Sequence, residues 1–189
     1  EGVDLFSKGN LFFSRRVGNR PSGNVTLNTN EEVTDFPNTV KVLNAAKVSG
    51  RTKKGLGIGV FNAITEKTNA IIRDSITGAV REEVVEPLSN YNIIVLDQQF
   101  NGNSSISLIN TNVTRSGHFR DANVTGLLAD ITNKKNTYNI EGQVKMSNVN
   151  NLDGNTTGLS TLFIARKVHG NFRYSFDHSY ADTKYNIND

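Results

Sequence analysis

In the stretch NIEGQVKMS, residues 139–147, the side chains alternate between two chemical classes. Even positions, from Ile140 to Met146, are apolar or glycine, whereas odd positions are Asn, Glu, Gln, Lys and Ser. Successive side chains of a β-strand point to opposite faces of the sheet. The stretch therefore predicts a strand with one apolar face and one polar face.

The stretch NFRYSFD, residues 171–177, repeats the pattern with an aromatic face. Together the two stretches supply candidate residues for the two faces of a membrane wall. The candidate lipid-facing residues are Ile140, Val144, Met146, Phe172, Tyr174 and Phe176. The candidate lumen-facing residues are Glu141, Gln143, Lys145, Arg173 and Asp177.

Outward from these stretches, the chain after residue 39 divides into strand-like segments joined by short turns and longer connections. The expected strands are residues 40–51, 56–65, 91–100, 105–114, 125–132, 137–147, 159–166 and 172–180. The expected turns lie at 53–55, 101–103, 133–136 and 169–171, and Asn101-Gly102 is a strong hairpin signal. The expected long connections are 66–90, 115–124 and 148–158. Alternation of short turns and long loops is typical of up-and-down outer-membrane barrels.

These patterns predict an all-β fold, an antiparallel up-and-down meander of about eight strands. We expect an outer-membrane β-barrel or the opening part of a larger one, with the strands in four hairpins within residues 40–189. Residues 1–39 show no sustained period and are expected to be a lead-in segment. A period of two also fits a soluble antiparallel sheet with one buried face, so a soluble β-sandwich or solenoid stays open.

Composition narrows the function. The chain has no Cys, which excludes a disulfide framework and a thiolate zinc site. No run approaches the 18 or so apolar residues of a transmembrane helix. The net charge is +3, and the Lys and Arg are scattered rather than gathered on one basic face. We therefore expect no nucleic-acid partner.

Several motifs were weighed for chemistry. The glycines of KGLGIGV, residues 54–60, alternate with apolar residues inside an expected strand, so they are expected to make room rather than to bind phosphate. His118, His169 and His178 lack a carboxylate partner at ligand spacing, which argues against a zinc site. No Ser lies in a nucleophile elbow.

Two further groups of residues fit structural roles better than chemical ones. The charged run REE at 81–83, with Glu86, lies in the longest expected loop and reads as a solvated cluster, although a pair of catalytic carboxylates stays open. Asn-x-Ser/Thr triplets begin at Asn24, Asn103, Asn112, Asn123 and Asn155. We expect most of these Asn residues at turns, where they suit the backbone.

Four stretches together carry a resemblance to a known family: EGVDLF at 1–6, LFFSRRVG at 11–18, AAKVSGRT at 45–52 and GIGVFNA at 57–63. EPLSNY at 86–91 and NSSI at 103–106 fit the same pattern. The chain resembles the Bacteroidetes-type uncharacterised outer-membrane proteins in which a C-terminal β-barrel region of unknown function follows a domain like carbohydrate-binding-module family nine. The resemblance implies a fragment at the opening of a larger barrel, and it implies no catalytic residues.

The expected function is a non-enzymatic outer-membrane β-barrel region, located in the cell outer membrane, that passes or docks glycan-related material. The expected partners are outer-membrane lipid and, from the resemblance, a glycan; no cofactor is expected. The alternative is a soluble all-β carbohydrate-binding or adhesion module whose aromatic faces stack on sugars. Dependence on detergent separates the two.

Overall fold

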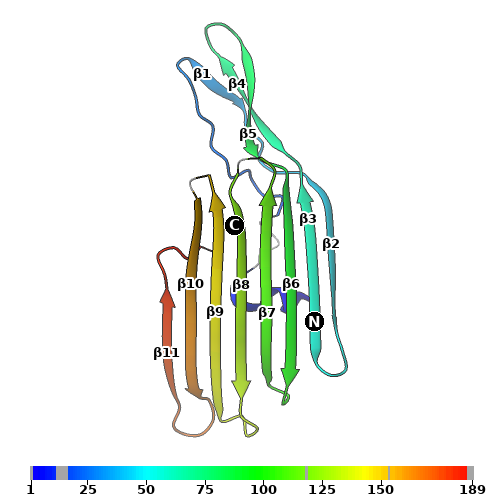
Figure 1. Ribbon diagram of the computed structural model, residues 1–189, viewed down its shortest axis with the longest axis vertical. Helices are drawn as coiled ribbons and strands as arrows, with labels where there is room; N and C mark the ends of the chain where they lie inside the picture. Colours follow the sequence, from blue (N-terminus) through cyan, green and yellow to red (C-terminus); the bar gives the residue numbers. More distant parts are fainter. Residues whose placement is uncertain (1, 12–16, 118, 153, 187–189) are drawn as a thin grey trace.

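The computed structural model describes residues 2–11, 17–117, 119–152 and 154–186. It contains one long eight-stranded sheet, a smaller three-stranded sheet and a short helical segment at the N-terminus (Figure 1). The three-stranded sheet projects beyond one end of the long sheet, and the helical segment crosses the long sheet near its middle. Strands thus dominate the described structure.

The eight-stranded sheet is a meander in which strands follow the order β11-β10-β9-β8-β7-β6-β3-β2. Every pair of neighbouring strands is antiparallel. The strands are β2 (Val42–Arg51), β3 (Leu56–Thr65), β6 (Ser89–Phe100), β7 (Ser104–Arg115), β8 (Asp121–Thr132), β9 (Tyr138–Asn151), β10 (Gly154–Lys167) and β11 (Tyr174–Ala181). The predicted all-β antiparallel class is confirmed, and each of the eight expected strands has a counterpart.

The eight-stranded sheet is open. Strands β2 and β11 form its two edges, and no pairing joins them among the described residues. An open edge leaves a row of backbone N–H and C=O groups without sheet partners. The described residues therefore form no closed barrel, and the predicted barrel, whole or as the opening part of a larger one, stays a prediction.

The connections differ from the expected alternation of turns and loops. The hairpin at Asn101-Gly102 is confirmed, with φ of 52° and 78° at these residues. The prediction was wrong for two of the three long connections. Only residues 116–120 join β7 to β8, and only residues 152–153 join β9 to β10. The strands simply continue through Asn-rich sequence, and three of the five triplet Asn residues, Asn112, Asn123 and Asn155, lie within strands rather than at turns.

The remaining long connection, residues 66–88, folds into most of the second sheet. Its strands β4 (Thr68–Asp74) and β5 (Val80–Glu86) form a hairpin, and β1 (Glu31–Asp35) pairs with the free side of β4. Ala70, Ile72 and Val85 are fully buried within this part of the chain. The expected loop is therefore a small sheet, which the sequence analysis missed.

The N-terminal segment also contains regular structure, in a region expected to be only a lead-in. Helix α1 (Gly2–Ser7) and the 3-10 turn η1 (Lys8–Asn10) lie against one face of the long sheet. Leu5, Phe6 and Leu11 are buried there in a single core. Their partners in that core are Phe61, Ala63, Ile93, Val95, Ile109 and Val124. We call the face that this segment covers the inward face, and the opposite one the outward face.

Three glycines of the inward face make room for the N-terminal segment. A Cβ on Gly57 would lie 2.9 Å from Leu5, one on Gly59 would lie 3.0 Å from Phe6, and one on Gly126 would lie 2.6 Å from Leu11. Gly57 and Gly59 thus lie within β3 and give it a small face, as the sequence predicted, whereas Gly55 lies in the turn before this strand. The small face receives the N-terminal helix.

Candidate functional site

The outward face of the eight-stranded sheet carries large apolar side chains that are exposed. In the direct cross-strand register, Ile58 pairs with Leu96, Leu96 with Leu108, Leu108 with Leu127 and Leu127 with Val144. We call this exposed surface the apolar band. Its members are Val48, Ile58, Val60, Ile94, Leu96, Ile106, Leu108, Leu127, Ile131, Ile140, Val144, Met146, Leu159, Phe163, Phe176 and Tyr180. A contiguous apolar surface of this kind on a sheet face marks a surface that contacts something other than water.

The outward face also has almost no Asp, Glu, Lys or Arg side chains in the described strands. Its charged residues are Asp121 and Lys167, and both lie at strand ends. The other charged residues of the eight strands point inward. These are Lys47, Arg51, Asp97, Arg115, Asp130, Glu141, Lys145, Arg166 and Asp177. The charged residues of the strands therefore lie on the inward face or at strand ends. The middle of the outward face, which carries the apolar band, has none of them.

Asp97 is the centre of the inward polar cluster. It is fully buried, and its Oδ1 accepts hydrogen bonds from Lys8 Nζ at 2.5 Å and Ser107 Oγ at 2.7 Å. Its Oδ2 accepts a hydrogen bond from Arg51 Nη2 at 2.6 Å. Two cations and a hydroxyl therefore compensate one buried carboxylate, as a buried charge requires. The cluster ties the N-terminal segment, through Lys8, to β2, β6 and β7.

A second inward cluster lies on β9 and β10. Glu141 accepts hydrogen bonds from Gln143 Nε2 and Arg166 Nη2, each at 2.8 Å. Lys145 Nζ donates to the backbone oxygen of Gly9 at 2.7 Å, which adds another tie to the N-terminal segment. These three β9 residues are therefore engaged in polar contacts on the face that the segment covers.

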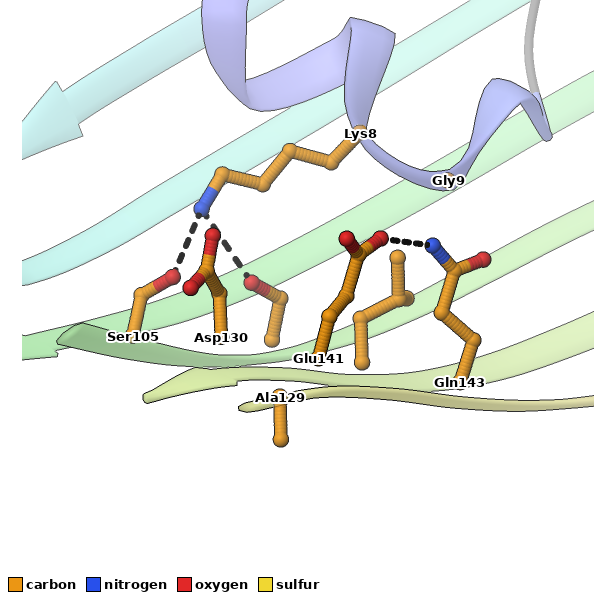
Figure 2. A pocket seen from close by; sticks show the side chains of 9 residues that line it. Lys8, Gly9, Ser105, Ala129, Asp130, Glu141 and Gln143 are labelled. Atoms are coloured by element: carbon orange, nitrogen blue, oxygen red, sulfur yellow. Dashed lines mark hydrogen bonds between the residues drawn. The ribbon is translucent and has the colours of Figure 1, made fainter. Parts of the chain in front are cut away.

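A cavity of about 180 Å³ lies between the N-terminal segment and the inward face. Figure 2 shows Lys8 reaching from the segment toward Ser105, while Glu141 and Gln143 stand beside each other on the wall and Asp130 lies nearby. The lining of the cavity thus includes one basic side chain, Lys8, and two acidic side chains, Asp130 and Glu141. Among the described residues, no group of three or more His, Asp or Glu side chains could hold a metal ion.

The two candidate sets of wall residues separate by face in the register. Ile140 pairs with Ala165, which pairs with Phe176, and this row faces outward with Val144, Met146 and Tyr174. Glu141, Gln143, Lys145 and Asp177 face inward. Phe172 and Arg173 lie in the connection before β11, because that strand begins at Tyr174 rather than at residue 172. That these faces meet lipid and a lumen stays a prediction.

The inward cluster around Asp97 was missed by sequence reasoning. Lys8 and Asp97 are 89 residues apart, and Arg51 and Asp97 are 46 apart. The only local signal was a single Asp directly after four apolar residues, in IIVLD at residues 93–97. A buried acid of that kind predicts a cationic partner without identifying it.

The charged run at 81–83, Glu86 and the histidines occupy the following positions in the fold. The charged run at 81–83 lies on strand β5 and not in a loop; Arg81 binds Glu31 at 2.8 Å and Glu83 at 2.9 Å. Glu86 is buried and accepts hydrogen bonds from Ser22. His169 lies in the connection after β10 and His178 on β11, whereas His118 lies outside the described residues.

Among the described residues, no helix is long and apolar enough to cross a membrane. The fold and the two faces define a class: an all-β antiparallel sheet with one exposed apolar face and one face that carries most of the charged side chains and is covered by the N-terminal segment. A family model described as "Domain of unknown function (DUF5916)" matches residues 1–189, so the chain belongs to that family. No curated protein and no solved structure matches the chain.

Proposed function

We propose that this chain is a non-enzymatic wall segment of an outer-membrane β-barrel. The apolar band would face lipid, and the inward face would line the interior together with the N-terminal segment. The observation that carries the proposal is the sorting of charge and apolar surface between the two faces of one sheet. A soluble sheet normally buries its apolar faces, whereas this sheet leaves one apolar face exposed and places nearly all the charged side chains of its strands on the face that the N-terminal segment covers.

Strand length and open edges support the same proposal. Strands β6 to β10 have 12 to 14 residues, enough to cross the hydrocarbon layer, which needs about 9–11 residues when strands tilt. Unpaired edges at β2 and β11 would be satisfied by further strands, because backbone groups in a bilayer must be paired. A larger barrel would supply such strands on both sides.

Site-specific labelling tests the proposal, and the absence of Cys makes it direct. Val144→Cys and Gln143→Cys place a label on the outward and inward face of neighbouring positions of β9. Each variant is labelled with an environment-sensitive fluorophore and reconstituted in phosphatidylethanolamine and phosphatidylglycerol vesicles containing nitroxide-labelled acyl chains. We expect acyl-chain nitroxides to quench the label at 144 strongly and the label at 143 weakly.

The soluble all-β binding or adhesion module is the competing outcome of the same experiment. A protein that is monodisperse without detergent and whose label at 144 is not quenched by acyl chains would overturn the membrane proposal. Passage or docking of glycan-related material rests on the family resemblance alone. It can be tested on the same vesicles by measuring the release of entrapped oligosaccharides.

A further inference from the structure

The outward face changes chemistry along the strands. Toward the end that carries the three-stranded sheet, Asn112 pairs directly with Asn123, Asn123 with Asn148 and Asn148 with Thr157. We call these four residues on β7, β8, β9 and β10 the amide patch. Leu108, Leu127 and Val144 of the apolar band lie four residues away on the same face of the same strands. The amide patch therefore borders the apolar band.

The amide patch lies in a shallow depression of about 310 Å³. The only charged side chain in its lining is Asp121, and that carboxylate already accepts a hydrogen bond from the backbone N–H of Arg115. Thr157 donates to Asn148, and Asn110 donates to Asn123. Among the described residues, the side chain of Asn112 forms no hydrogen bond. Uncharged amides with spare donors and acceptors suit a hydrated polar layer rather than hydrocarbon.

The opposite border of the apolar band has a different composition. Tyr138 of β9 pairs with Lys167, which pairs with Tyr174, and all three point outward near the turns. Tyr and Lys side chains prefer the membrane interface, where the ring or stem is in apolar surroundings and the polar end reaches water. The apolar band is therefore bordered by polar or amphipathic residues at both ends.

The distance between the two borders matches a membrane. Asn148 lies ten residues after Tyr138 on β9, which is roughly 33 Å of strand at about 3.3 Å per residue. A strand tilt of about 35–45° reduces this to a height of roughly 25 Å, the height of the apolar belt of outer-membrane barrels.

From this arrangement we propose that the amide patch contacts the lipid headgroup layer, at the membrane boundary nearer the three-stranded sheet. This inference rests on the proposed function, since it places the bilayer against the apolar band. The three-stranded sheet then lies outside the hydrocarbon layer, where its charged groups are hydrated.

A depth series along β8 tests the inference. Asn123→Cys and Leu127→Cys carry the same fluorophore in vesicles of phosphatidylethanolamine and phosphatidylglycerol, with the nitroxide placed on the headgroup, on the mid-acyl chain or in the buffer. We expect headgroup nitroxides to quench the label at 123 most and mid-chain nitroxides to quench the label at 127 most. Asn148→Cys and Val144→Cys repeat the comparison on β9, so that a failure of one strand to fold leaves the other to decide.

The outcomes separate this inference from the proposed function. If positions 127 and 144 report acyl chains but 123 and 148 respond only to the buffer nitroxide, or only to mid-chain nitroxides, the headgroup contact is overturned and the membrane wall stands. If 127 and 144 also report only the buffer, both are overturned.

Discussion

The two faces of the eight-stranded sheet use the same strands for opposite purposes. The inward face buries an apolar core and a carboxylate with its cations beneath the N-terminal segment. The outward face leaves Leu127 and Val144 about half exposed, at 52% and 48%. Among the described residues, the inward face is thus covered by this chain's own N-terminal segment, whereas the apolar side chains of the outward face stay exposed.

Removing the charge at the centre of the inward face should have the largest effect on the stability of the protein. Asp97→Ala leaves the Lys8 ammonium and the Arg51 guanidinium facing each other without their shared carboxylate. Removing one partner of a buried ion pair costs about 3–5 kcal/mol. We expect a loss of folding stability near the lower end, because Lys8 and Arg51 keep side-chain exposures of 25% and 17%. Urea unfolding of the reconstituted protein measures it.

Asp177→Ala is the matched control, because Asp177 also points inward but is exposed on the edge strand β11. Its loss should change the free energy of unfolding by no more than about 0.5 kcal/mol. Equal losses of stability in Asp97→Ala and Asp177→Ala would contradict the view that Asp97 holds the N-terminal segment on the inward face.

A second test compares arginine on the two faces at adjacent positions. Val144→Arg places a guanidinium in the middle of the apolar band, which we expect to cost roughly 2–4 kcal/mol in lipid. Gln143→Arg should be mild, because position 143 faces inward, near Glu141. An Arg on the outward face near the border of the apolar band should cost about 0–1 kcal/mol, since its side chain can reach the lipid headgroups. Equal penalties at 143 and 144 would favour the soluble module.

The sequence predicted the eight strands well because period-two alternation is a local signal. Residues 56–65 matched β3 at both ends, and residues 139–147 lie wholly within β9. The register then separates Glu141 from Val144 by face without further information. Alternation is readable even where the partner of a face is unknown.

The missed features depend on contacts between distant residues. Leu5 and Phe6 form a buried helix face only because Gly57 and Gly59 leave space for them. The ion pair of Lys8 with Asp97 likewise needs the folded chain. The prediction that Asn112 and Asn123 lie at turns failed for another reason. Asn is favoured at turns, and no local pattern indicated that these two residues pair with each other in neighbouring strands.

Glycines on the two faces of the sheet should differ in their tolerance of a methyl group. Gly59→Ala puts a methyl group 3.0 Å from Phe6 on the inward face, so we expect overpacking to cost about 1 kcal/mol. Gly142→Ala is the control, because its methyl group would meet nothing within 4 Å on the outward face. Gly142→Ala should be neutral or slightly stabilising. Adding Phe6→Ala to Gly59→Ala should remove the penalty of the methyl group, and additive effects would contradict the packing explanation.

We expect the smallest effect from the charged residues of the three-stranded sheet, whose side chains are less deeply buried than Asp97 of the inward face. Hydrogen bonds from Arg81 and from the backbone of Asn28 lower the pKa of Glu31 to about 2, from an ordinary 4.5. A carboxyl with a lowered pKa in the folded state adds stability that is complete above pH 4.5 and is lost as the pH falls through about 2. Arg81→Gln should return the pKa of Glu31 toward its ordinary value, as carboxyl carbon NMR shifts would report. Asp74 is the internal control, because backbone hydrogen bonds from Thr77 and Ile76 lower its pKa without Arg81. A pKa of Glu31 that stays near 2 after Arg81→Gln would show that the hydrogen bonds from Asn28, rather than those from Arg81, lower this pKa.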